Sequence, residues 1–129
     1  MGYKNVSATT DISDDGIAVV TVKGKIVTSL SATAVVGVIE SLTRETEVPQ
    51  IIISLKYLDY IDSYSFNWIL NVYRKQVESG GTLALCEPNE DIMELFQITN
   101  FGKAIPIYRT EADARDAFKT GNANSRIAC

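Results

Sequence analysis

Three consecutive isoleucines, Ile51, Ile52 and Ile53, constrain the fold of this chain more than any other feature. Successive side chains of a strand point to opposite faces, so an unbroken apolar run requires cover on both faces. Such a strand lies inside a sheet that has helices packed against it. Two further apolar runs, at residues 17–22 and 83–86, predict neighbouring strands of the same sheet.

Segments with helical spacing of apolar residues separate these strand-like runs. The expected helices lie between the cap-forming serines at 29–31 and Pro49, at about 64–77, from 88 to 98, and from 110 to 118. Residues 105–108 predict a final strand, at a sheet edge because it contains Pro106. The pattern predicts one α/β domain with a small mixed β-sheet and about four α-helices. We expect its core at about 16–119 and a polar, frayed tail at 120–129.

The helix expected at 64–77 has two distinct faces. Tyr64, Trp68 and Lys75 fall on the face opposite the apolar one, and neighbouring exposed aromatics are typical of a partner surface. The alternative is that a neighbouring helix or the tail covers them, and a homodimer is a third possibility. The apolar face, which we expect to enter the core, carries Phe66, Ile69, Leu70, Tyr73 and Val77.

Composition narrows the classes of function. The net charge of −4 and a pI near 4.8 argue against a nucleic-acid groove, which needs clustered Lys and Arg. No run approaches the roughly 18 apolar residues of a membrane span. Cys86 and Cys129 suggest no disulfide framework, so a reducing cytoplasm is the expected setting.

Catalysis is not expected. The chain has no histidine, the commonest general base and a common metal ligand, and Cys86 therefore has no imidazole partner. Asp59 and Asp62 flank a loop without forming an evident pocket. We expect no catalytic residue, no metal and no cofactor.

The segment Tyr60-Ile61-Asp62-Ser63-Tyr64-Ser65-Phe66 carries the main functional prediction. Its hydroxyl groups follow a strand and open a helix, where free N–H groups and the positive end of the helix dipole favour anions. A phosphoryl group added there would gain local hydrogen bonds and change the surface charge by close to two units. These are properties of a switch.

Four local motifs resemble the STAS domain of bacterial anti-sigma factor antagonists, over about residues 18–118. They are Val-Lys-Gly-Lys-Ile at 22–26, the aspartate-serine pair within 57–66, Ser-Gly-Gly-Thr-Leu at 79–83, and Leu-Phe-Gln-Ile-Thr-Asn-Phe at 95–101. The resemblance implies a partner-switching regulator of transcription. Its partners would be an anti-sigma factor that is also a serine kinase, and a phosphatase that resets the cycle.

By the same resemblance, the partner-binding residues are Asp59, Asp62, Ser63, Tyr64 and Ser65, and the exposed aromatic face of the helix adds Trp68. Tyr64 stands at the position where the family usually has its phosphorylated Ser or Thr. Phosphorylation would then fall on Ser63 or Ser65, although Asp62 and Ser63 are equally suited to capping the helix. The alternatives are a constitutive or homodimerising interaction module, and a sensor of a small molecule such as a nucleotide or lipid.

Overall fold

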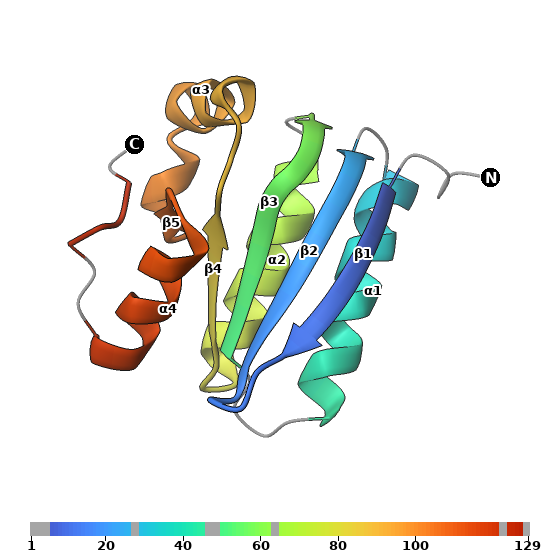
Figure 1. The fold of residues 1–129 in the computed structure, drawn as a ribbon. Helices are drawn as coiled ribbons and strands as arrows, with labels where there is room; N and C mark the ends of the chain where they lie inside the picture. Colours follow the sequence, from blue (N-terminus) through green and yellow to red (C-terminus); the bar gives the residue numbers. More distant parts are fainter. Residues whose placement is uncertain (1–5, 27–28, 46–49, 63–64, 122–123, 128–129) are drawn as a thin grey trace.

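The described residues form a mixed five-stranded sheet with helices on both faces (Figure 1). The computed structural model describes residues 6–26, 29–45, 50–62, 65–121 and 124–127. The strands are β1 (Val6–Ile12), β2 (Ile17–Ile26), β3 (Gln50–Ile61), β4 (Thr82–Cys86) and β5 (Ile107–Tyr108). The helices are α1 (Ser29–Glu45), α2 (Ser65–Glu78), α3 (Glu90–Thr99), the 3-10 turn η1 (Phe101–Lys103) and α4 (Glu111–Thr120).

The sheet has the strand order β1-β2-β3-β4-β5. β1 is antiparallel to β2, and the other neighbours are parallel. Helices α1 and α2 cover one face, α4 covers part of the other, and α3 lies beyond the carboxyl end of β4 (Figure 1). The predicted α/β class, with a small mixed sheet and four α-helices, is confirmed.

The central strand is buried on both faces, as its isoleucines predict. Ile51 and Ile53 pack into the cluster shared with α1 and α2, while Ile52 packs into the cluster under α4. All three are buried. β3 pairs with β4 over Gln50–Ser54 and with β2 as far as Ile61, which places its carboxyl end close to the start of α2.

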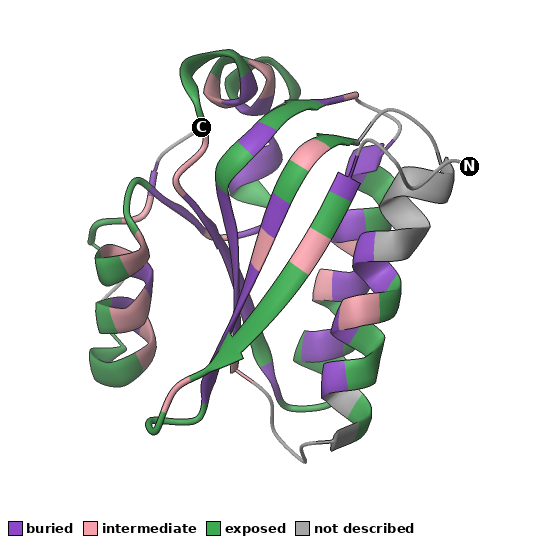
Figure 2. Cartoon of the chain, turned by 45° about the vertical axis from the view of Figure 1, so that its right-hand side comes forward, coloured by how far each residue is buried: buried purple, intermediate pink, exposed green. Residues whose placement is uncertain are grey.

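The edges of the domain extend beyond the expected core. β1, which lies outside the predicted range, pairs along its whole length with β2, although most of its residues are exposed (Figure 2). At the other end, where a frayed tail was expected, residues 124 and 125 are exposed but Arg126 and Ile127 contact the domain. Ile127 is buried and its N–H donates to Ile107 O at 2.7 Å.

The apolar face of α2 differs from the predicted one at its end. Phe66 and Ile69 are buried and Leu70 and Tyr73 pack partly against the core, but Val77 is 50% exposed. At about 100° per residue, Val77 lies roughly 80° around the helix from Ile69. The buried positions of the last two turns are Val72 and Gln76. In α3, Ile98 is 70% exposed.

Candidate functional site

The start of α2 is fixed by Asp62. One carboxylate oxygen, Oδ1, accepts hydrogen bonds from the Ser65 N–H at 2.9 Å and from the Ser65 hydroxyl at 2.8 Å. The backbone carbonyl of Asp62 also accepts from the Ser65 N–H, at 3.2 Å. A side-chain acceptor three residues before a helical N–H is the arrangement that caps helix N-termini. The capping role weighed for Asp62 is therefore present.

Ser65 is buried, with 1% of its surface exposed. Its hydroxyl is committed to Asp62, so a kinase would reach this oxygen only after that contact opened. A phosphate on Ser65 would also lie against the Asp62 carboxylate, where like charges repel. Ser63 and Tyr64, the other hydroxyl-bearing positions, lie outside the described residues, and their roles stay predictions.

The other two predicted partner-binding residues border different surfaces. Asp59 is exposed, and its carbonyl lies beside Asn89, which precedes α3. Trp68 is 39% exposed and lines a groove of about 340 Å³ between α1 and α2, together with Val36 and Lys75. The predicted set thus spans both sides of the α2 N-terminus.

Aromatic packing couples the start of α2 to α3, a feature that the sequence analysis did not identify. The rings of Phe66 and Phe101 stack with centroids 4.5 Å apart, and Phe96 lies 5.4 Å from Phe66 and 5.3 Å from Phe101. Such pairs add stability beyond their buried area. They hold α2 and α3 together at the carboxyl edge of the sheet.

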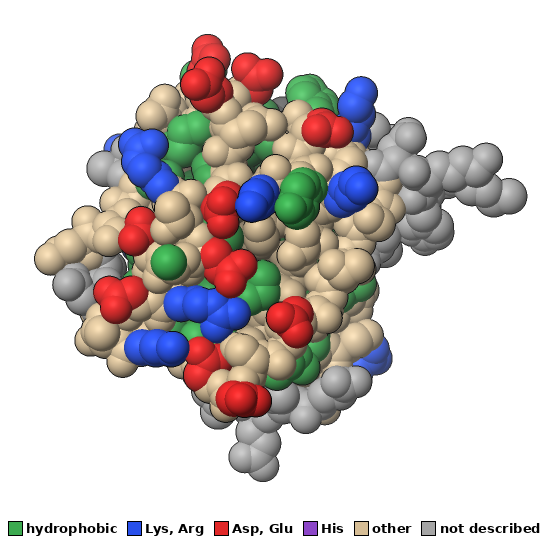
Figure 3. Space-filling model, viewed as in Figure 1, with side chains coloured by type: hydrophobic (Ala, Val, Ile, Leu, Met, Phe, Trp, Pro, Cys, Tyr) green, Lys and Arg blue, Asp and Glu red, His purple; other side chains and the backbone are tan. Residues whose placement is uncertain are grey.

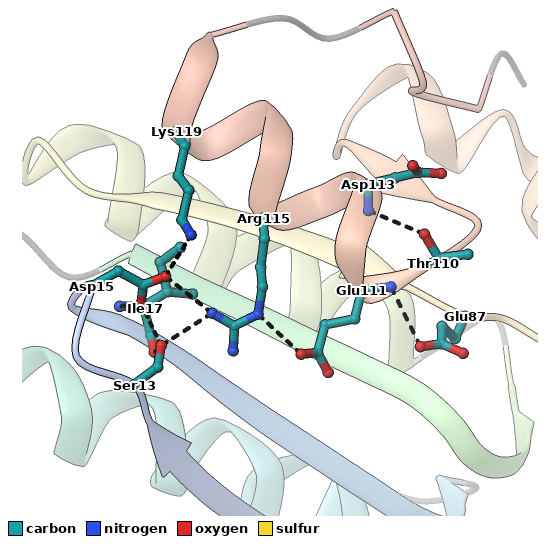
Figure 4. Close-up of polar contacts among 9 residues, drawn as sticks. All are labelled: Ser13, Asp15, Ile17, Glu87, Thr110, Glu111, Asp113, Arg115 and Lys119. Atoms are coloured by element: carbon teal, nitrogen blue, oxygen red, sulfur yellow. Dashed lines mark hydrogen bonds and ion pairs between the residues drawn. The ribbon is translucent and has the colours of Figure 1, made fainter.

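A polar network on the opposite side of the molecule joins the β1–β2 turn to α4 (Figure 4). Arg115 pairs with Glu111 at 3.0 Å and with Asp15 at 3.2 Å, and Lys119 also pairs with Asp15, at 3.1 Å. The Ser13 hydroxyl, the Ile17 N–H and Lys119 lower the pKa of Asp15 below its ordinary value. About 100 residues separate the two halves of this network, so sequence spacing gave no signal for it.

The first turn of α4 lies near the end of β4. The Thr110 hydroxyl caps the helix by accepting from the Asp113 N–H at 3.0 Å. Glu87 has a left-handed backbone with φ of 58°, and its carboxylate accepts from the Glu111 N–H at 3.3 Å. These oxygens accept from N–H groups in the first turn of α4, where the helix dipole stabilises anions.

Little in the described part of the chain points to metal or thiol chemistry. It contains no group of three or more His, Cys, Asp or Glu side chains that could hold a metal ion. Cys86 is fully buried, and burial raises the pKa of its thiol to about 12, with a smaller opposing effect from Ser54. None of the helices in the described ranges is long and apolar enough to cross a membrane.

Comparison with known proteins identifies the family to which this chain belongs. The sequence model of the STAS domain matches residues 10–114, and the chain belongs to this family. An anti-sigma F factor antagonist of Paenibacillus polymyxa is 28% identical over 99 residues, which cover 77% of this chain and 84% of that protein. The crystal structure of an anti-sigma factor antagonist from Mycobacterium paratuberculosis has a TM-score of 0.76 at 22% identity, covering 88% of this chain and 94% of that one. At that identity the likeness shows the fold alone.

A relative from Thermotoga maritima has a shorter match. It is 33% identical over 67 residues, which cover 52% of this chain and 59% of that relative's length. The family expected from the four sequence motifs is confirmed, and the fold is that of the anti-sigma factor antagonists.

Proposed function

We propose that this chain is a bacterial regulator of the anti-sigma factor antagonist type, which acts by binding a protein partner and not by catalysis. The observation that carries the proposal is the similarity to an anti-sigma F factor antagonist along most of both chains. The partner would be an anti-sigma factor, in the cytoplasm. Its docking surface would comprise Asp59, Asp62, Ser63, Tyr64, Ser65 and Trp68.

Phosphorylation of Ser63 is the form of control that we propose. Ser65 is the weaker candidate, since its hydroxyl is buried against Asp62. A phosphate on Ser63 would add close to two negative charges to a segment that already carries Asp59 and Asp62. In a docked surface this charge would be repelled and desolvated, so the complex would dissociate. A serine kinase would add the phosphate and a phosphatase would remove it.

Capture of partners from the native cell tests the proposal. The tagged chain would serve as bait, and the intact mass of the recovered bait would report an added phosphate of about 80 Da, the mass of one phosphoryl group. Ser63→Asp is expected to lose the partner and Ser63→Ala to keep it. Equal capture by Ser63→Ala, Ser63→Asp, Ser65→Ala and Ser65→Asp would eliminate phosphorylation control but leave partner binding intact.

Self-association is the second candidate, favoured by the exposure of Trp68. A homodimer formed through this residue would elute early in size-exclusion chromatography and revert to a monomer in Trp68→Ala. A wild-type monomer at high concentration would rule this candidate out.

A further inference from the structure

A small apolar groove separates the end of β3 from α3. It encloses about 200 Å³, and its floor consists of the buried side chains of Ile61 and Ile92. Two large side chains of its rim are open to solvent, since Tyr60 is 48% exposed and Ile98 is 70% exposed. Leu95 also lines the groove. An isoleucine this exposed beside an exposed tyrosine is typical of a contact surface.

The helix side of this α3 groove is acidic. Asp91 and Glu94 line it, and Glu90 precedes them on the same helix. None of the three carboxylates forms an ion pair with another described residue, and α3 contains no Lys or Arg. Figure 3 shows acidic side chains gathered over α3. Lys and Arg side chains lie over the neighbouring strands, which no described helix covers on this face. Lys25, the cross-strand neighbour of Tyr60, gives the strand side of the groove one cation.

The walls of the groove are fixed to each other. The Asn89 amide group donates to Leu58 O at 3.1 Å, and its oxygen caps α3 by accepting from the Ile92 N–H at 2.8 Å. Phe96, on the inner side of α3, stacks against Phe101. A groove held in this way is formed before a ligand arrives, which lowers the entropic cost of binding.

We propose that the α3 groove binds a basic amphipathic helix of the protein partner. Apolar side chains of that helix would insert between Tyr60 and Ile98, and Lys or Arg one turn away would pair with Asp91 and Glu94. Helices recognised in grooves present such anchors at spacings of three and four residues. The inference deepens the proposed function, on which it depends, because it adds the chemistry of the partner segment.

Charge distinguishes this groove from the one that Trp68 lines. The α1–α2 groove mixes carboxylates with cations, since Glu40 and Glu78 line it with Arg74 and Lys75. The residues that line the α3 groove include Asp91 and Glu94 and no Lys or Arg, and Lys25 lies beside the groove on β2. Exposed carboxylates steer a basic segment toward the site and set its orientation more than they add affinity.

An NMR titration with two designed peptides tests the inference. The probes are a 14-residue amphipathic helix of Leu and Lys, and the same sequence with Glu in place of Lys. We expect the Leu/Lys peptide to shift the amide signals of Tyr60, Ile61, Ile92, Leu95 and Ile98, and the Leu/Glu peptide to bind at least about tenfold more weakly. No saturable binding of the Leu/Lys peptide, or shifts centred elsewhere, would overturn the inference.

Matched variants separate the apolar contribution from the charged one. Ile98→Gln should weaken binding of the Leu/Lys peptide about tenfold, whereas Ile12→Gln, which changes another exposed isoleucine, on β1, should not. Asp91→Asn with Glu94→Gln should reduce the salt dependence of binding, and Asp14→Asn with Asp116→Asn should leave it unchanged. Equal effects of test and control variants would show non-specific attraction only.

The same variants distinguish this inference from the proposed function. A bait carrying Ile98→Gln that still captures the wild-type partner from the native cell overturns the assignment of the groove and leaves partner binding intact. Loss of capture with Ile98→Gln but not with Ile12→Gln supports both the assignment of the groove and the proposed function. If no bait captures a partner while the Leu/Lys peptide binds the groove, the proposed function fails and the groove chemistry stands.

Discussion

The side-chain amide of Asn89 donates to the backbone carbonyl of Leu58 at 3.1 Å. Its oxygen accepts from the Ile92 N–H at 2.8 Å, so one side chain joins the end of β3 to the first turn of α3. Asn89 lies just outside the helix with an extended backbone, at φ of −71° and ψ of 173°. The relative positions of β3 and α3, and hence the shape of the α3 groove, depend on this residue.

Two substitutions of Asn89 separate the hydrogen bond that its oxygen accepts from those that its amide group donates. Asn89→Asp keeps the oxygen that caps α3 but removes the donor to Leu58, and we expect a loss of about 1 kcal/mol of stability. Asn89→Ala removes both, and the loss should reach about 2 kcal/mol. Urea unfolding measures both values. An Asn89→Asp variant as stable as the wild type would mean that the bond to Leu58 contributes nothing.

Asp62 is expected to stabilise the start of α2 independently of any partner. Asp62→Ala leaves the N–H and the hydroxyl of Ser65 without their acceptor, which should lower the free energy of unfolding by about 1–2 kcal/mol. Asp59→Ala is the control, because Asp59 is exposed nearby and its side chain makes no hydrogen bond with a described residue. Equal stabilities of the two variants in urea would contradict the capping role.

The burial of the central strand could be predicted from the residues of the strand itself. Ile51, Ile52 and Ile53 place apolar side chains on both faces of the strand, so both faces must be covered. The edge strand β1 carried no comparable signal. Its outward residues Thr9 and Asp11 are polar and exposed, and Ile12 is exposed as well, so the segment resembles a loop when its partner β2 is unknown.

In the candidate site, only contacts between residues close in the sequence could be predicted. The hydrogen bond from Ser65 to Asp62 spans three residues, which is why a capping role could be expected from position. The bond from Asn89 to Leu58 spans 31 residues, and only the parallel pairing of β3 with β4 brings these ends together. The same limit applies to Val77, whose apolar character suggested burial although the helix turns it outward.

A charge at position 52 should be far more damaging than one at position 77. Ile52 is fully buried under α4, so Ile52→Asp would bury a carboxylate at a cost of several kcal/mol, against a total stability of ~5–15 kcal/mol. Val77→Asp changes an exposed residue and should leave the domain folded. Circular dichroism and urea unfolding distinguish the two. A folded Ile52→Asp variant would refute the assignment of the central strand.

The thiol of Cys86 should be unreactive in the folded protein. Burial raises its pKa to about 12, so almost no reactive thiolate is present near neutral pH. In a Cys129→Ser variant, which leaves Cys86 as the one cysteine of the chain, Ellman's reagent should label no thiol until denaturant is added. Rapid labelling without denaturant would mean that β4 opens readily.

Acid should weaken the link between the β1–β2 turn and α4. The Ser13 hydroxyl, the Ile17 N–H and Lys119 favour the charged form of Asp15, and its pKa is therefore lower in the folded chain than in the unfolded one. A lowered pKa makes a stabilising contribution that is complete above the unfolded value of about 4 and disappears as the pH falls through the folded value. Arg115 lies on the same carboxylate and acts in the same direction.

Asp15→Asn should therefore destabilise the domain most at neutral pH, and the difference from the wild type should shrink as the pH is lowered from about 5 toward 2. Urea midpoints of both proteins across this range measure the effect. Asp14→Asn is the matched control, because Asp14 lies in the same turn and contacts no described cation. A difference that stays constant with pH would mean that Asp15 acts through its shape and not through its charge.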